Sequence, residues 1–237
     1  MNSPDDNLAE QERIRSVYQQ WSGAATTAQY AWHRPEILQQ LAARSRTLAP
    51  LLAEALGTDL SAARILDVGC GTGGFLRQLI AWGADPSRLM GTEFQQDRLD
   101  HARRHTAEGV RWHLGGLDCA ATDSIDLASA ETVFSSILDQ ELRRGLATEM
   151  WRTIRPGGWC MVFDFRYDNP RNPNVRKVTQ AELRRYWPAA QCHYRTLLLA
   201  PPIARLLAGV PYLATELLAA MVPPLRSHFI FMARKGS

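Results

Sequence analysis

Residues 64–74 of the chain read RILDVGCGTGG, an apolar segment that runs directly into a loop of closely spaced glycines. The apolar part, Arg64 to Val68, predicts a buried strand, and the residues from Gly74 onward predict a helix. Glycine lets the backbone approach a ligand closely and adopt positive φ at little cost. In open α/β sheets, ligands bind in the crevice at the carboxyl ends of the strands. The stretch therefore predicts an α/β fold with a ligand site at residues 67–73.

Strands and helices alternate after this stretch. Strands are expected at residues 64–68, 88–93, 109–114, 125–130, 159–165, 193–199 and 228–234. Helices are expected at residues 35–56, 74–82, 96–105 and 139–154. Such alternation requires right-handed crossovers and parallel strands that are covered on both faces. We expect a doubly wound, seven-stranded, mostly parallel sheet with an antiparallel last strand, a helical N-terminal prelude, and a helical insertion before the last strand.

The composition is that of an ordinary globular protein. The 237 residues are 46% hydrophobic and 22% charged, and the formal net charge of +3 is too small to indicate nucleic-acid binding. Four widely spaced cysteines argue against a disulfide framework or a structural zinc site. The polar, acidic start does not resemble a secretory signal, which favours the cytoplasm. We expect a helical cap over residues 1–60 and one compact ligand-binding domain over residues 61–237.

The most apolar part of the chain, residues 197–224, is interrupted by five prolines and by Arg205 and Glu216. It cannot supply the ~20 uninterrupted apolar residues of a membrane span. We expect no stable membrane insertion, although this segment could form an apolar lid or a surface that touches a membrane or a partner.

The glycine loop admits two classes of nucleotide ligand. Gly69, Gly71 and Gly74 match the Gly-x-Gly-x-x-Gly pattern of dinucleotide sites. Asp67, at the strand end, instead suits a ligand with an ammonium group and repels a pyrophosphate. Glu93, at the end of the second strand, can accept hydrogen bonds from a ribose diol in either case. The long helical prelude and the lack of a second substrate domain disfavour the dinucleotide.

Three motifs carry a family resemblance. Residues 65–74 resemble the first motif of the class I S-adenosylmethionine-dependent methyltransferases. Residues 91–94 look like the end of their second strand, with Glu93 in place of the more frequent Asp, and residues 155–158 look like the turn before their fifth strand. Residues 133–139, 164–176, 199–202 and 224–228 look like a bacterial subgroup associated with polysaccharide or secondary-metabolite gene clusters. The resemblance implies a Rossmann-like fold and S-adenosylmethionine as the cofactor.

The resemblance also implies roles for the matched positions. The cofactor would be held by the loop from Asp67 to Gly73, with Asp67 and the glycines at its methionine part and Glu93 at its ribose. An acid after the third strand usually meets the adenine amino group, and Asp118 is the nearest candidate. Phe94 either packs on the adenine or belongs to the core. The expected cofactor-binding residues are Asp67, Gly69, Cys70, Gly71, Gly73, Glu93, Phe94 and Asp118.

The acceptor side is less defined by the sequence. His33 is the preferred general base, because imidazole titrates near neutral pH, and it could instead cap the following helix. Asp164 is an alternative base or a structural carboxylate. Expected substrate-binding residues are Tyr18, Tyr30, Trp32, Arg166, Asn169 and Arg171. The arginines suit carboxylates or phosphates, which favours a small polar or anionic acceptor such as a secondary metabolite, sugar or glycan.

These patterns favour transfer of a methyl group to an oxygen or nitrogen of that acceptor, by a protein without a metal that acts as a monomer or a homodimer. Two alternatives remain open: a nicotinamide-dependent oxidoreductase and a non-catalytic module that binds S-adenosylmethionine. Methylation of nucleic acid is less favoured, because Glu131-Thr132-Val133-Phe134 stands where an Asn-Pro-Pro-Tyr type of motif is expected.

Overall fold

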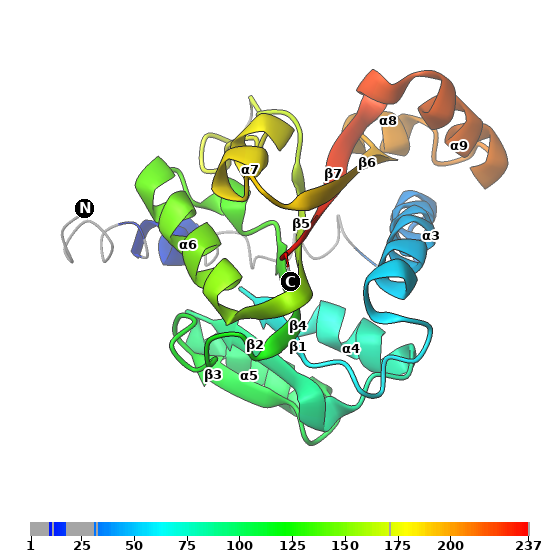
Figure 1. Cartoon of the computed structure of the whole chain (residues 1–237). Helices are drawn as coiled ribbons and strands as arrows, with labels where there is room; N and C mark the ends of the chain where they lie inside the picture. The colour runs from blue at the N-terminus through cyan, green and yellow to red at the C-terminus, as the bar shows by residue number, and fades with distance from the viewer. Residues whose placement is uncertain (1–9, 11, 18–30, 32, 171, 237) are drawn as a thin grey trace.

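The computed structural model describes residues 10, 12–17, 31, 33–170 and 172–236 (Figure 1). They contain one seven-stranded sheet with the order β3-β2-β1-β4-β5-β7-β6. The strands are β1 (Ile65–Val68), β2 (Leu89–Glu93), β3 (Arg111–Leu114), β4 (Ile125–Glu131), β5 (Ile154–Phe165), β6 (Gln191–Leu199) and β7 (Arg226–Arg234). Strands β1 to β5 are parallel, and β7 is antiparallel to both β5 and β6. The predicted fold class, with an antiparallel last strand, is confirmed.

The helices follow the expected pattern with one addition. They are α3 (Pro35–Leu56), α4 (Gly74–Ala81), α5 (Gln96–His105), α6 (Gln140–Thr153), α7 (Gln180–Tyr186), α8 (Pro201–Leu206) and α9 (Tyr212–Met221), with short 3₁₀ turns η1 (Pro86–Arg88), η2 (Phe134–Ser136) and η3 (Pro223–Leu225). Helix α3 begins with a proline at its first position, and Gly57, whose φ is 85°, follows its last residue as the C-cap. Helices α8 and α9 form the predicted insertion between β6 and β7. Helix α7 is the addition, which was not expected from the sequence.

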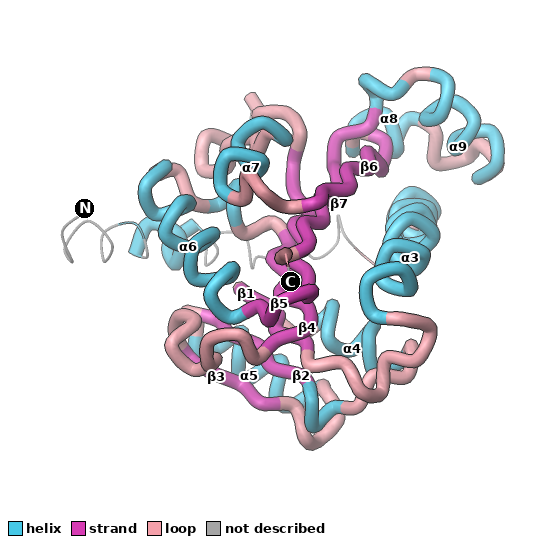
Figure 2. The backbone as a smooth tube through the Cα atoms, in the orientation of Figure 1, coloured by secondary structure: helices cyan, strands magenta, loops and turns pink. Residues whose placement is uncertain are grey.

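Alternate residues of the central strands enter two separate apolar cores. Ile65 of β1 packs in the core beneath α3 and α4, whereas its neighbour Leu66 packs in the core beneath α6 and α7. Figure 2 shows the strands between these two pairs of helices. This arrangement follows from the two-residue period of a strand, which directs successive side chains to opposite faces.

Helix α3 belongs to the first of these cores. Its residues Leu48, Leu51 and Leu52 are buried together with Ile65 and with Leu79 of α4. The part of the expected N-terminal cap that the structure describes therefore shares its packing with the sheet. The division of the chain at residue 60 stays a prediction.

The sheet creates a crevice where its strand order reverses. Strand β1 lies between β2 and β4, so the connections that follow β1 and β4 lead to opposite sides of the sheet. At such a switch point, the loops at the carboxyl ends of adjacent strands diverge and leave room for a ligand. The glycine loop that follows β1 lies at this point.

Candidate cofactor site

A cavity of roughly 610 Å³ lies at the carboxyl ends of β1, β2 and β4. Its described lining comes from residues 67–72, 74–75, 92–95, 98, 115–117, 131–133 and 136–137, from one face of α6, and from Glu10, Ile14 and Arg15 near the N-terminus. Sites for small molecules and cofactors are typically concavities of this size at this position in an α/β sheet.

The glycine loop at the floor of the cavity has a backbone that other residues do not easily adopt. Gly69, Gly71 and Gly73 have φ angles of 63°, 56° and 81°. A Cβ at Gly69 would lie 2.7 Å from Cγ2 of Val133, and a Cβ at Gly71 would lie 2.5 Å from Nη2 of Arg98. The positive φ favours glycine at all three positions, and at Gly69 the space also requires it, whereas the Arg98 side chain could move away from a Cβ at position 71.

Asp67 provides a buried carboxylate at the tip of β1. Its Oδ1 accepts a hydrogen bond of 2.9 Å from the hydroxyl of Ser129 on β4, and the side chain lines the cavity. Burial raises the pKa of Asp67 well above its usual value, and the nearby charge of Glu131 raises it further. A cationic ligand would relieve both effects, because it favours the ionised form of the carboxyl group.

Glu131 and Arg44 form an ion pair beside Asp67, which the sequence analysis missed. Arg44 projects from α3 and donates from Nη2 to the Glu131 carboxylate. Its Nη1 donates to Oε1 of Gln78, and its guanidinium lies 5.5 Å and 5.4 Å from the ring centroids of Phe75 and Phe163. Burial raises the pKa of Glu131, although Arg44 opposes this. With Asp67 ionised, the three groups carry one net negative charge.

Glu93 holds the glycine loop against the end of β2. One carboxylate oxygen accepts from the backbone N–H groups of Phe94 and Gln95, at 2.7 Å and 3.1 Å. The other accepts from the N–H of Gly71 at 3.0 Å and lies 4.0 Å from Nε of Arg98. A carboxylate offers about four acceptor positions, so Oε2 is the oxygen that has room for a ligand hydroxyl.

The other expected cofactor residues divide into two groups. Half-exposed Phe94 and buried Cys70 line the cavity, and burial raises the pKa of the Cys70 thiol, so the thiol stays neutral. Asp118 does not line it: its side chain is 80% exposed and faces Nε2 of His113 at 3.2 Å. The preceding Leu117 is buried and takes the place in the lining, because the turn at 115–118 directs adjacent side chains oppositely. The lining gives no support to an adenine contact by Asp118, which stays a prediction.

The expected general bases also lie away from the cavity. His33 is exposed in the turn before α3 and does not line the cavity. Asp164 is fully buried at the end of β5, where it accepts hydrogen bonds from the backbone N–H groups of Ser135 and Phe165 at 2.9 Å and 2.8 Å. Burial raises its pKa to about 6. Its oxygens face the protein backbone, so the geometry assigns Asp164 a structural role and gives no support to either residue as a base.

The loop after β5 does not reach the cavity where the structure describes it. Arg166 donates to the backbone carbonyls of Pro223 and Arg226, at 3.0 Å and 2.6 Å, and Asn169 is exposed. Neither contributes to the cavity lining. Tyr18, Tyr30, Trp32 and Arg171 lie outside the described residues.

Helix α6 supplies the wall opposite the glycine loop, which the sequence analysis did not anticipate. Leu142, Gly145 and Leu146 form its apolar part, and Glu141 and Glu149 contribute carboxylates. A signal was available in the sequence, since these residues recur at helical spacing after the N-cap Asp139, whose side chain accepts from the N–H of Leu142 at 2.9 Å.

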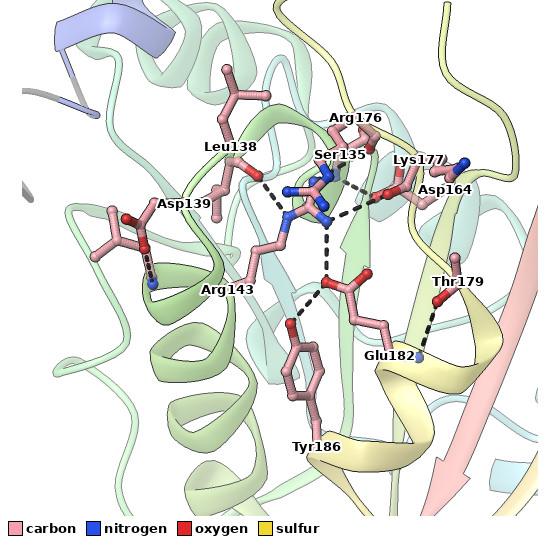
Figure 3. A network of polar contacts seen from close by, with 12 residues as sticks. Ser135, Leu138, Asp139, Arg143, Asp164, Arg176, Lys177, Thr179, Glu182 and Tyr186 are labelled. Atoms are coloured by element: carbon pink, nitrogen blue, oxygen red, sulfur yellow. Dashed lines mark hydrogen bonds and ion pairs between the residues drawn. The ribbon is translucent and has the colours of Figure 1, made fainter.

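A fully buried arginine fixes this wall (Figure 3). Arg143 donates to the carbonyl of Ile137 at 2.6 Å, to the carbonyls of Arg176 and Lys177, and to Glu182 of α7 at 3.1 Å. The hydroxyl of Tyr186 donates to the same Glu182 oxygen at 2.9 Å. Arg143 thus ties α6, the segment before it and α7 into one unit behind the cavity.

Carboxylates outnumber cations around the cavity. Its described lining contains six acidic residues and two arginines: Glu10, Asp67, Glu93, Glu131, Glu141 and Glu149 against Arg15 and Arg98. Arg13, Arg44, Arg144 and Arg152 pair with Glu10, Glu131, Glu141 and Glu149 from outside this lining, so the site is electronegative mainly around the buried Asp67. It therefore suits a ligand with positive charge and is unfavourable for a pyrophosphate.

Comparison with known proteins agrees with this geometry. Residues 65–158 match a family described as "Methyltransferase domain". They are a class I S-adenosylmethionine-dependent methyltransferase domain. The cofactor of this domain is S-adenosylmethionine, and its electropositive sulfonium and amino groups agree with the electronegative cavity.

Similar curated proteins and solved structures extend the match. The chain is 29% identical over 151 residues to a biotin biosynthesis bifunctional protein, BioHC, of Cellvibrio japonicus. The aligned part covers 62% of this chain and 26% of the relative. It is 31% identical over 120 residues to a fatty-acid O-methyltransferase of Mycolicibacterium smegmatis, covering 47% of this chain and 41% of the relative. The matched part thus spans less than half the length of these relatives.

One solved structure resembles the whole chain. The 1,6-didemethyltoxoflavin-N1-methyltransferase of Burkholderia thailandensis, with bound 1,6-didemethyltoxoflavin and S-adenosylhomocysteine, gives a TM-score of 0.66 at 15% identity. The match covers 100% of this chain and 92% of that one. At this identity, the similarity establishes the shared fold of the methyltransferase domain and its surrounding elements.

Proposed function

We propose that this protein transfers a methyl group from S-adenosylmethionine to an oxygen or nitrogen atom of a small-molecule acceptor. The observation that carries the proposal is the buried Asp67 carboxylate beside the bare glycine loop, in a cavity where acidic residues predominate. When bound, S-adenosylmethionine supplies an electrophilic methyl group on a cationic sulfur.

The residues of the cavity fit the parts of that cofactor. Asp67, with the Arg44–Glu131 pair beside it, supplies negative charge for the amino group and the sulfonium. Oε2 of Glu93 has room to accept a ribose hydroxyl. Half-exposed Phe94 and buried Leu117 offer apolar surface to the adenine, in place of the expected hydrogen bond from Asp118. Helix α6 then forms the cavity wall beside which the acceptor would bind.

The acceptor that fits best has an apolar body and no strong negative charge. The wall that faces the glycine loop contains Val133, Ile137, Leu142 and Leu146, with Glu141 and Glu149 beside them. The aliphatic groups would bind an apolar surface, and the two carboxylates, each paired with an arginine on α6, offer no cation to an anionic acceptor. The described structure therefore gives no support to the anionic acceptor that Arg166 led us to expect.

The acceptor atom stays open between oxygen and nitrogen. The curated relative from M. smegmatis is an O-methyltransferase, and the structural neighbour from B. thailandensis is an N1-methyltransferase. Alignment of the acceptor with the methyl–sulfur bond would supply much of the rate. An alcohol would also need a proton acceptor, and the described candidates are the lining carboxylates of Glu141 and Glu149, each of which pairs with an arginine three residues further along α6.

The cell compartment and assembly state belong to the same proposal. The four cysteines are free thiols, which agrees with a reducing compartment such as the cytoplasm. A monomer or a homodimer acting on a small molecule is the expected form.

Titration calorimetry followed by a transfer assay tests the proposal. The purified protein should bind S-adenosylmethionine and S-adenosylhomocysteine, and should not bind NAD. With isotopically labelled cofactor and a panel of amines, phenols and fatty acids, label should appear in an acceptor with the wild type and not with Asp67→Asn. Tight binding of NAD would favour the oxidoreductase. Cofactor binding without transfer to any acceptor would favour a non-catalytic module.

A further inference from the structure

The insertion between β6 and β7 presents an apolar surface to solvent. Leu206 and Met221 are 83% and 80% exposed, and Leu213, Leu217 and Val222 are also exposed. We call these five residues the insertion surface. In Figure 1, α8 and α9 project at one end of the molecule, away from α6. A concentration of exposed aliphatic side chains in one short segment indicates a contact surface for an apolar partner.

The charges in this segment are as informative as its apolar residues. Between residues 201 and 225 the charged side chains are Arg205, which is exposed, and Glu216, which is partly buried. The segment therefore carries one fully exposed positive charge, and its single carboxylate is only partly exposed. A surface that binds another protein usually has a polar rim with several charged or hydrogen-bonding side chains. Residues 201–225 contribute only two charged side chains, Arg205 and Glu216.

The border of the insertion surface has groups suited to a lipid headgroup region. Arg166 donates to the carbonyls of Pro223 and Arg226, and its guanidinium lies 5.1 Å from the ring centroid of Tyr167. Tyr167 is itself about half exposed, and its hydroxyl donates to the carbonyl of Pro224 at 3.1 Å. Tyrosine and arginine side chains of this kind are favoured where an apolar surface meets the polar layer of a membrane.

The dimensions of the helices exclude a spanning role and allow a peripheral one. No helix among the described residues is long and apolar enough to cross a membrane. Helices α8 and α9 have six and ten residues and bury their other faces, through Ala204, Thr215 and Ala219, against the protein. Short amphipathic helices with an aliphatic face and flanking cations bind within the interface of a bilayer.

We propose that the insertion surface binds reversibly to the surface of an anionic lipid bilayer. The five aliphatic side chains enter the boundary between headgroups and acyl chains, while Arg205 and Arg166 contact anionic headgroups. The protein's net charge of +3 assists the approach. Binding of this kind is separate from the cofactor cavity and does not require the methyl-transfer reaction.

Vesicle flotation tests the proposal with the full chain. Vesicles of phosphatidylcholine mixed with phosphatidylglycerol should carry the wild type to the top of a density gradient, and vesicles of phosphatidylcholine alone should carry much less. The double variant Leu206→Glu/Met221→Glu should bind roughly tenfold more weakly or worse, because two large aliphatic groups are lost from the contact. Arg205→Glu should weaken binding to the anionic vesicles, and higher salt should do the same.

Controls distinguish this surface from others and from misfolding. Leu114→Glu replaces an exposed leucine at the end of β3, outside the insertion surface, and should float like the wild type. Leu206→Gln/Met221→Gln removes the aliphatic groups without adding charge and should also lose binding, and each variant should keep the wild-type unfolding temperature. The proposal is overturned by a wild type that does not float, or by a double variant that floats equally well. It is also overturned if sedimentation shows a lipid-free dimer that Leu206→Glu/Met221→Glu dissociates, because a second copy then covers the surface.

Discussion

Arg44 on α3 pairs with Glu131 at the end of β4, across 87 residues of sequence. The pair joins the N-terminal helix to the floor of the cofactor cavity and lies beside Asp67, whose pKa is raised by burial and by the charge of Glu131. The charge of the cavity floor therefore depends on a residue outside the glycine loop and outside the matched methyltransferase domain.

Loss of Arg44 alone should be more harmful than loss of the pair. Arg44→Met leaves Glu131 without its cation in a largely buried position, and we expect the free energy of unfolding to fall by about 2–4 kcal/mol. Arg44→Met/Glu131→Leu should recover most of that loss, because neither charge then remains. Urea denaturation measures both variants. A single variant as stable as the wild type would show that the pair contributes nothing to the fold.

Removal of the buried Arg143 should behave differently from removal of Arg44. Arg143→Met should cost about 3–5 kcal/mol, because Glu182 and three carbonyls lose their donor. Adding Glu182→Leu should not restore stability, since the carbonyls of Ile137, Arg176 and Lys177 stay without a partner. Urea denaturation separates the cases, and a double variant with wild-type stability would contradict this account of the α6 wall.

The glycine loop can be tested with a matched pair of alanine variants. Gly69 and Gly83 both have positive φ, at 63° and 99°, but a Cβ at Gly83 meets nothing within 4 Å, whereas at Gly69 it would lie 2.7 Å from Val133. Both variants should lose stability from backbone strain. Gly69→Ala should also bind S-adenosylhomocysteine at least about tenfold more weakly, because the loop must shift, while Gly83→Ala keeps its affinity. Equal affinities of Gly69→Ala and Gly83→Ala in calorimetry would show that the glycine loop is not part of the cofactor site.

Asp164 should give the fold a measurable dependence on pH. Its pKa is raised from 3.8 to about 6, so the folded protein holds this proton more tightly than the unfolded chain does. The resulting stabilisation is complete below pH 3.8 and is lost as the pH rises through about 6, by about 3 kcal/mol in all. Asp164→Asn cannot ionise, so the wild type should lose stability relative to this variant between pH 4 and pH 7. If the unfolding free energies of the wild type and Asp164→Asn change with pH in parallel, ionisation of Asp164 does not cause the pH dependence.

Local sequence signals were sufficient for the sheet and the glycine loop. Strand β1, Gly69 and Gly71 are defined by a short apolar run and by residues whose backbone conformation is restrictive, so neighbouring sequence determines them. Asp67 and Glu93 could be placed in the cavity because strand ends in a parallel sheet gather at one edge. The start of α7 also had a local signal, since Thr179 accepts a hydrogen bond from the N–H of Glu182, the pattern of a capping box.

Contacts between distant segments could not be predicted in the same way. The Arg44–Glu131 pair depends on how α3 crosses the sheet, and the Arg143 network depends on where the segment at 176–177 returns. Leu117 enters the lining and Asp118 does not, because a one-residue difference in a turn decides which side chain faces the cavity. Asp164 was expected at the site because it ends a strand, but its carboxylate turns to the backbone of Ser135.

The most direct test of the central claim is the number of protons released when S-adenosylmethionine binds. If the Asp67 carboxylate holds the cationic part of the cofactor, binding lowers the pKa of a group whose pKa burial has raised, and so favours release of its proton. Calorimetry in two buffers of different ionisation enthalpy, between about pH 5.5 and 7 and thus below the pKa of an amino group, measures that number. The wild type should release up to one proton and bind more weakly as the pH falls. Asp67→Asn should release none and bind at least about tenfold more weakly. Equal affinity and equal proton release in the two proteins would contradict the account.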